Sequence, residues 1–192
     1  MKIYVSYAWG DKKEKGVSRE VIVDKLCEAF KKKGHEVRRD KTHMKYRDII
    51  RDFMNDIGSA DALIAIISRK YLKSRFCMYE LAKAYDWGHD FSKRIFPIVL
   101  DDVEDIVYST DARIALIKEW EKMFDDLDKK LASLSFSQKA AFEEEYSDLS
   151  FIKEKAHIPL AKISGMTRNS DAQKLMEEKF EEIINQVLSK SR

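Results

Sequence analysis

The sequence of 192 residues contains no apolar run near the roughly 18 residues that a membrane-spanning helix needs. Its first residues, MKIYVSYAWGD, alternate as a strand does and lack the basic and apolar regions of a signal peptide. The two cysteines, Cys27 and Cys77, form no CxxC pair, so a disulfide framework is not supported. These absences lead us to expect a soluble cytoplasmic protein in a reducing compartment, with no membrane partner.

Several motifs of known chemistry are missing as well. There is no GxxxxGKS or GxxxxGKT, which excludes a P-loop, and no GxGxxG follows the first predicted strand, so a Rossmann-type hydride-carrier site is not expected. No GxSxG occurs, and neither cysteine has a histidine nearby. His35, Asp40 and His43 lack a metal-ligand spacing, so we assign them to a loop and a strand edge and expect no metal.

Charge is abundant but balanced. The chain has 36 Lys and Arg against 34 Asp and Glu, a net charge of +2, which gives no electrostatic argument for nucleic acid. Hydrophobic residues make up 44% and aromatic residues 11%, enough to build a core and to exclude wholesale disorder. The length suits a single domain over residues 1–192.

The first hundred residues alternate between strand-like and helix-like segments. Strands are predicted at 3–7, 35–39, 62–67 and 95–100, and helices around 22–30, 49–57 and 71–87. The run ALIAII (62–67) is typical of a strand buried on both faces, whereas 35–39 is weak and suits a sheet edge. Gly34 and Gly58 can end the first two helices, while Pro97 conflicts with the fourth strand because proline removes a ladder donor. The βαβαβαβ order predicts a doubly wound parallel α/β sheet.

Residues 101–156 predict a helical hairpin inserted after the fourth strand. One helix carries an apolar stripe, the other a shorter one, and SLSFS (133–137) is the turn. The stripes are Ile117, Trp120, Phe124, Leu127, Leu131 and Leu134, and Phe142, Tyr146, Leu149 and Ile152. We favour the interpretation that the stripes pack against each other and against the sheet over the alternative that they form a surface for self-association.

The last part of the chain predicts two further elements. Residues 157–164 are interpreted as a short fifth strand. A final helix begins with a capping box of Ser170 and Gln173. Its apolar face is formed by Phe180, Ile183, Ile184 and Val187.

Three segments, in their order and spacing, resemble a TIR domain of the bacterial type. They are IYVSYAWGD (3–11), RRDKTHMKYRDIIRDFMNDIGSADALIAIIS (38–68) and SRKYLKSRFCMYEL (68–81), and RIFPIVL (94–100) is similar to the family's fourth strand. The resemblance implies a flavodoxin-like sheet of order 2-1-3-4-5 and, in some bacterial members, a helical insert. In such sheets ligands bind beyond the carboxyl ends of the strands at the switch point, here between the first and third strands.

The resemblance also implies a chemistry, because some TIR domains cleave NAD with an acidic residue at the helix position that Glu80 occupies. Nicotinamide leaves NAD as a neutral amide and needs no proton, so one carboxylate that stabilises positive charge on the ribose can suffice. On a helix, Cys77, Glu80, Ala84 and Trp87 fall on one stripe, which places Glu80 beside small and apolar side chains. NAD is then the substrate, and no cofactor is expected.

Eight residues are candidates for binding the substrate. They are Tyr7, Ala8, Trp9, Asp40, Lys41, Ser74, Phe76 and Cys77. For Tyr7 and Cys77 a structural role is favoured. Asp40 and Lys41 open the family's BB loop, which gates the site and makes TIR–TIR contacts.

The other candidates each have two interpretations. Trp9 can stack on a base or pack against Gly10 and the neighbouring loop. Ser74 can bond a ribose hydroxyl or begin a helical turn. Phe76 stands where the family often has tryptophan, so it can contact the nicotinamide side of the ligand or pack in the core.

Two functions of different classes follow from the resemblance. The first is an NAD hydrolase or cyclase in bacterial anti-phage defence or signalling, which forms a TIR–TIR homo-oligomer on activation. The alternative is a non-catalytic TIR–TIR scaffold, for which changes at Thr42–Tyr46 would abolish the output and Glu80→Gln would not. A phospho-acceptor receiver domain is rejected because the first strand leads into Tyr-Ala-Trp and the third into Ile-Ile-Ser, without the required aspartates.

Overall fold

The computed structural model describes residues 1–10, 18–39, 56–57, 59–87, 90–166, 178 and 180–189. Its sheet is parallel, with the order β2-β1-β3-β4 among these residues. The strands are β1 (Ile3–Tyr7), β2 (Val37–Arg38), β3 (Ala62–Ile67) and β4 (Ile95–Val99). In the register of β1 and β3, Ser6 lies opposite Ala65 and Tyr7 opposite Ile66. The predicted doubly wound parallel sheet is confirmed, with the weak β2 at an edge.

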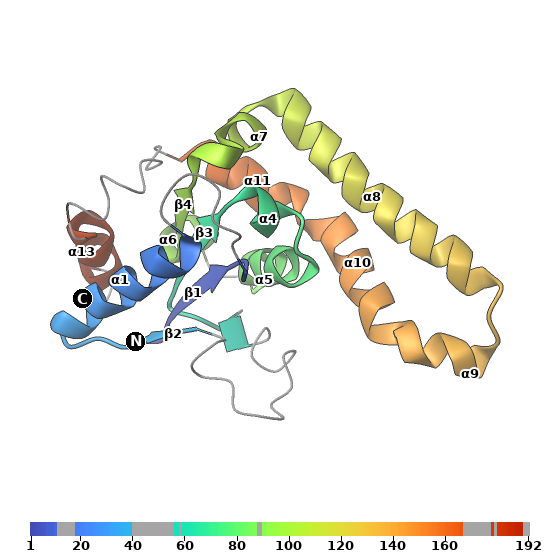
Figure 1. Cartoon of the computed structure of the whole chain (residues 1–192), viewed down its shortest axis with the longest axis horizontal. Coiled ribbons are helices and arrows are strands. Elements are labelled where there is room, and N and C mark those ends of the chain that lie inside the picture. The colour runs from blue at the N-terminus through green and yellow to red at the C-terminus, as the bar shows by residue number, and fades with distance from the viewer. Residues whose placement is uncertain are drawn as a thin grey trace.

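Helices cover both faces of the sheet (Figure 1). On one face lie α1 (Arg19–Lys32) and α13 (Glu181–Ser189), whose apolar residues pack with Ile3, Val5 and Tyr7 of β1. On the other lie α4 (Arg69–Leu72) and α5 (Arg75–Asp86), which share a core with Tyr4 and Ala8. Alternate residues of β1 therefore serve opposite layers, as expected from the two-residue period of a strand.

Serine side chains set where the helices begin. Ser18 accepts a hydrogen bond from the Val21 amide at the start of α1. Ser68 caps α4 and Ser74 caps α5 in the same way, so the single helix predicted at 71–87 is in fact two helices. At the other end of α1, Gly34 takes the left-handed conformation, φ +81°, that suits a glycine after a helix.

A helical hairpin follows β4 and extends away from the sheet (Figure 1). The connecting elements are α6 (Phe91–Arg94) before β4, and η1 (Asp101–Val103) and α7 (Glu104–Tyr108) after it. The hairpin consists of α8 (Thr110–Ala132), α9 (Phe136–Lys139), η2 (Ala140–Phe142) and α10 (Glu143–Lys155). Trp120, Leu149 and Ile152 join the same buried core as α5. These residues of the two apolar stripes therefore pack against the sheet-bearing part of the protein. The assignment of 101–156 as an insert within one domain stays a prediction.

The fifth strand predicted at 157–164 is wrong, because these residues form α11 (His157–Ser164). Leu160 and Ile163 are buried against the core at helical spacing. Pro159 lies in the first turn, where its missing N–H costs no helix hydrogen bond. Within the described residues β4 is then an edge strand, a position that tolerates Pro97.

Several predicted features lie outside the described residues. They are Asp40, Lys41, the segment Thr42–Tyr46, most of the helix at 49–57 with Gly58, and the capping box of Ser170 and Gln173. In the part of the chain that the structure describes, no helix has the length and hydropathy to cross a bilayer.

The thiol of Cys27 is expected to resist alkylation at neutral pH. It is half-buried on α1, and burial raises its pKa, an effect that nearby Asp24 reinforces and Arg39 opposes. Because the folded state holds this proton more tightly, its contribution to stability is present below the thiol's unfolded pKa and is lost as pH rises through the folded value. Iodoacetamide labelling followed by mass spectrometry should show slow modification of the native protein at pH 7.5 and much faster modification in urea. Equal rates would contradict it.

Candidate functional site

The loops after β1 and β3 meet at the carboxyl edge of the sheet. Lys70, two residues into α4, donates from Nζ to the carbonyl oxygen of Gly10 at 2.6 Å and also to that of Trp9. This bridge joins the two strands between which the order of the sheet reverses. It therefore marks the switch point at which ligands bind in sheets of this type.

Glu80 lies on α5, and its side chain contacts β1 close to this edge. Glu80 is only 6% exposed, so it is not a solvated surface residue. The Ser6 hydroxyl, itself buried, donates to Glu80 Oε2 at 2.5 Å. A hydrogen bond from this buried hydroxyl satisfies the buried carboxyl group and fixes it against the strand.

A second hydroxyl extends this contact. The Tyr71 hydroxyl lies 3.1 Å from Ser6 Oγ and is fully buried. Burial raises the pKa of Tyr71 well above its usual range, nearby Cys77 and Glu80 act in the same direction and the hydrogen bond from Ser6 opposes them, so the phenol stays protonated. The Ser6 hydroxyl is therefore directed at two oxygens, Glu80 Oε2 and the Tyr71 hydroxyl, and links the carboxyl group of Glu80 to a buried phenol.

Two other elements bring charged groups near the carboxyl edge of the sheet. Arg19 begins α1, where burial lowers the pKa of its guanidinium while negative charge on Asp102 and Cys77 raises it, and it remains a cation. Asp102, after β4, accepts from the backbone N–H of Arg69 at 3.1 Å, and its carbonyl accepts from the Arg69 guanidinium at 2.8 Å. The start of α4 is thereby tied to the segment after β4.

Five of the eight candidate substrate-binding residues fall into three groups. Trp9 and Phe76 are partly exposed, 47% and 37%, and the Arg75 guanidinium lies 4.9 Å from the centre of the Phe76 ring. Ala8 and Cys77 are buried in the same cluster, which is the cluster that α5 covers. Tyr7 packs in the opposite layer, with apolar residues of α1.

Ser74 has a local role in the structure. Its hydroxyl accepts from the backbone N–H of Cys77 at 3.3 Å and so begins α5. Of its two interpretations, the helical turn is the one that the described contacts support. Asp40 and Lys41 lie outside the described residues.

Gly10 is expected to be intolerant of a side chain. Its φ is +73°, and a Cβ atom there would lie 3.2 Å from Lys70 Nζ, so alanine would be strained and would push on the bridge between the two loops. Gly10→Ala should cost about 1–2 kcal/mol of unfolding free energy, measured by urea denaturation. Gly165→Ala is the matched control, because Gly165 has an ordinary φ and a Cβ there would lie 3.6 Å from the nearest atom. Equal effects of the two would contradict the prediction.

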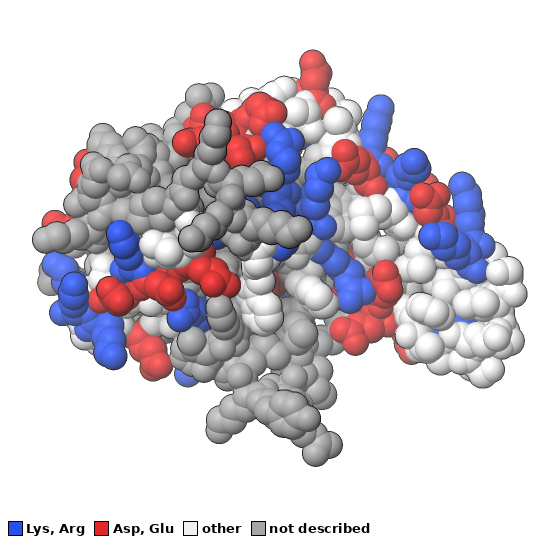
Figure 2. Space-filling model, viewed as in Figure 1, with Lys and Arg blue, Asp and Glu red and all other residues white. Residues whose placement is uncertain are grey.

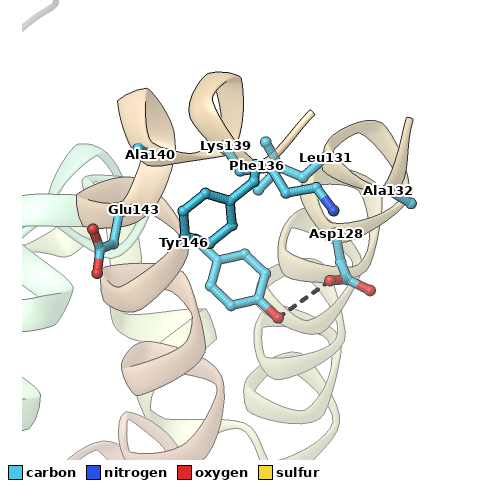
Figure 3. A pocket seen from close by; sticks show the side chains of 8 residues that line it. All are labelled: Asp128, Leu131, Ala132, Phe136, Lys139, Ala140, Glu143 and Tyr146. Atoms are coloured by element: carbon cyan, nitrogen blue, oxygen red, sulfur yellow. Dashed lines mark hydrogen bonds between the residues drawn. The ribbon is translucent and has the colours of Figure 1, made fainter. Parts of the chain in front are cut away.

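A hollow of about 450 Å³ lies elsewhere, at the outer end of the hairpin (Figure 3). Leu131, Ala132 and Phe136 line it together with Tyr146, whose hydroxyl donates to Asp128 at 3.2 Å. None of the candidate site residues contributes to it, so it is not the candidate active site. Nor do any three His, Cys, Asp or Glu side chains gather into a metal site within the described ranges.

Two residues of the site were not singled out from the sequence. Ser6 and Tyr71 come from segments that were interpreted only as a strand and a helix. A signal was nevertheless present for Ser6, since it shares with Tyr4 the face of β1 opposite to Ile3, Val5 and Tyr7. A hydroxyl inside a fully buried strand needs a hydrogen-bond partner, and the helix packed on that face supplies one.

The family model of the TIR domain matches residues 3–143. The chain belongs to the TIR domain family. The TIR domains in the structure of the activated Roq1 resistosome directly recognizing the pathogen effector XopQ resemble this TIR domain over 95% of this chain and 98% of that one, with a TM-score of 0.58. At 20% identity this likeness shows the fold alone. No match was found among curated proteins.

Proposed function

We propose that this TIR domain cleaves NAD at the bond between nicotinamide and ribose, as a hydrolase or a cyclase, with Glu80 as its catalytic residue. The observation that carries the proposal is the buried Glu80 carboxylate, held by Ser6 at the carboxyl edge of β1 and β3. A carboxylate in this low-dielectric position acts strongly on any positive charge that develops beside it.

The reaction needs little more from the protein than that carboxylate. As the C–N bond breaks, its electron pair leaves with nicotinamide, which departs neutral, and positive charge develops on the ribose. Glu80 stabilises this charge. Water then adds to the ribose carbon and releases a proton, which yields ADP-ribose, or a nucleophile within the same ADP-ribose adds and yields a cyclic product.

Other described residues suit the rest of the NAD molecule. The pyrophosphate is doubly negative, and Arg19 supplies positive charge close to Cys77 and therefore to the start of the Glu80 helix. Trp9 and Phe76 expose ring surface on which a base or nicotinamide can stack. NAD is a substrate in this proposal.

The proposal also covers the self-association of this TIR domain and its biological setting. TIR–TIR association on activation is part of the proposal, and the solved structure similar in fold is described as an activated resistosome. A cytoplasmic location, a role in bacterial anti-phage defence or signalling, and the lack of nucleic-acid and membrane partners stay predictions.

The proposal is tested by incubating the concentrated protein with NAD, with and without a crowding agent, and separating the products by chromatography. Release of nicotinamide is expected, and the accompanying peak distinguishes ADP-ribose from a cyclic product. Light scattering on the same samples reports assembly. Intact NAD in samples that do assemble would overturn the enzyme and favour the scaffold.

A further inference from the structure

We propose that Ser6 and Tyr71 form a positioning relay around Glu80, in which Tyr71 holds Ser6 and Ser6 holds the catalytic carboxylate in one orientation. This inference rests on the proposed NAD cleavage and deepens it. Neither residue would touch the substrate.

The relay spans three elements that the fold brings together. Ser6 comes from the centre strand, Tyr71 from α4 and Glu80 from α5, and all three side chains are buried. Their contacts measure 2.5 Å from Ser6 to Glu80 and 3.1 Å from Ser6 to Tyr71. Buried polar side chains joined in a network restrict one another, so the contact with Tyr71 limits the orientations that the Ser6 hydroxyl can take beside the carboxylate.

The backbone keeps the relay in place. Ser6 is paired with β3 through Ala65, and the Tyr71 backbone N–H donates to the Ser68 hydroxyl at 3.2 Å. Ser6 and Tyr71 are thus both fixed by strand and helix geometry, whereas a glutamate side chain alone has several rotatable bonds. The relay removes that freedom before the substrate arrives, and orientation of this kind governs rate more than binding.

The kinetic test compares Ser6→Ala, Tyr71→Phe and the double variant with wild type. We expect Ser6→Ala to lower kcat by roughly tenfold or more, because small displacements of a catalytic group cost up to about a hundredfold, with KM changed little. The double variant should be no slower than Ser6→Ala, since Tyr71 acts only through Ser6. Tyr85→Phe is the control. It also removes a tyrosine hydroxyl from the protein, but Tyr85 is a residue of α5 whose ring contacts Phe91. Additive losses, or a change confined to KM, would overturn the relay.

A second readout does not need activity. In protein carrying ¹³C at the glutamate carboxyl carbons, NMR titration follows Glu80, and Glu80→Gln identifies its signal. Loss of a hydrogen bond to the charged form should raise the midpoint in Ser6→Ala. Within the described residues, Tyr71 of α4 interacts with Glu80 and with Cys77 of α5, and Arg19 of α1 interacts with Cys77; all three are unchanged by that substitution. An unchanged midpoint overturns the relay, whereas intact NAD with a raised midpoint overturns only the proposed function.

A separate observation concerns the outer end of the hairpin. We infer that this end, defined by Asp128, Phe136, Lys139 and Glu143, docks onto the same end of a second copy of the chain. The Phe136 side chain is 92% exposed beside the hollow of about 450 Å³, and the surface there is largely uncharged (Figure 2, white, over α9). An exposed aromatic ring next to an unfilled hollow loses favourable contacts that a partner would restore.

Charge identifies the partner as a second copy. The hollow is flanked by two carboxylates, Asp128 of α8 and Glu143 of α10, and by the ammonium group of Lys139 on α9. In a two-fold arrangement the same patch is used on both copies, so Lys139 of each can meet the carboxylates of the other while Phe136 enters the facing hollow. The patch is small compared with the roughly 800 Å² per partner of a standard interface, so the association is concentration dependent.

Sedimentation velocity over a concentration series tests this docking. Wild type should show a reversible dimer that Phe136→Ser or Lys139→Glu weakens at least about tenfold, while Met123→Ser, which removes an exposed apolar residue elsewhere on α8, has no effect. Mixing Lys139→Glu with the Asp128→Lys/Glu143→Lys variant should restore pairing as a heterodimer. A wild type that is monomeric throughout, or a dimer insensitive to these changes, would overturn the inference, whatever the enzymatic activity proves to be.

Discussion

Replacing Glu80 with glutamine is expected to lower the rate of NAD cleavage by about 10²- to 10³-fold, the range found when one electrostatic stabiliser of a transition state is removed. Glutamine keeps the length of the side chain and an oxygen that can accept from Ser6, but it carries no charge to stabilise the ribose cation. The buried position of Glu80 makes the loss large, because water contributes little in its place. Chromatography of released nicotinamide measures it.

The matched control for this variant is Asp86→Asn. Asp86 ends the same helix, is partly exposed, and pairs with Lys155 at 3.4 Å, so losing its charge should leave cleavage unchanged. Circular dichroism and thermal unfolding should show both variants folded. A Glu80→Gln protein that cleaves NAD at the wild-type rate would remove Glu80 from the chemistry and leave the scaffold as the better interpretation.

Trp120→Ala is expected to be the most destabilising single change in the hairpin, at about 3–5 kcal/mol of unfolding free energy. The indole is 3% exposed, and its Nε1 donates to the Leu72 carbonyl oxygen at 3.1 Å, which joins α8 to the end of α4. Truncation would leave both a cavity and an unpaired carbonyl. Urea denaturation followed by circular dichroism measures the loss.

Two further variants separate these effects. Trp120→Phe keeps most of the apolar volume but loses the donor, and should cost about 1–3 kcal/mol. Ile114→Ala, at a residue of α8 that is 45% exposed, should stay within about 0.5 kcal/mol. If Trp120→Ala were as stable as Ile114→Ala, the hairpin would not depend on this anchor.

Local patterns were sufficient to predict the central sheet and the burial of the Glu80 side chain. The unbroken apolar run of β3 and the alternation of β1 depend only on neighbouring residues. The stripe through Cys77, Glu80, Ala84 and Trp87 correctly indicated a buried face at its first three positions, whereas Trp87, at the end of α5, is exposed. These features could be read directly because strand and helix periods repeat along the chain.

The errors and omissions arose from tertiary contacts. Residues 157–164 are too few for their apolar spacing to distinguish a strand from a helix, and packing of Leu160 and Ile163 against the core decides the matter. Ser6 and Glu80 are 74 residues apart, so their hydrogen bond has no local signature. The division between α4 and α5 depends on Ser74 turning its hydroxyl back to its own helix.

The hairpin is attached to the site at one end only. Arg75, the first residue of α5, reaches the buried Asp148 of α10 at 3.6 Å, and Trp120 and Ile152 are buried beside it. The hollow at the outer end is lined by none of the site residues that the structure describes. Mutations that lengthen, shorten or recharge the outer end should therefore accumulate without moving Glu80. During evolution, related chains could then come to select different partners while the chemistry at the edge of the sheet stays the same.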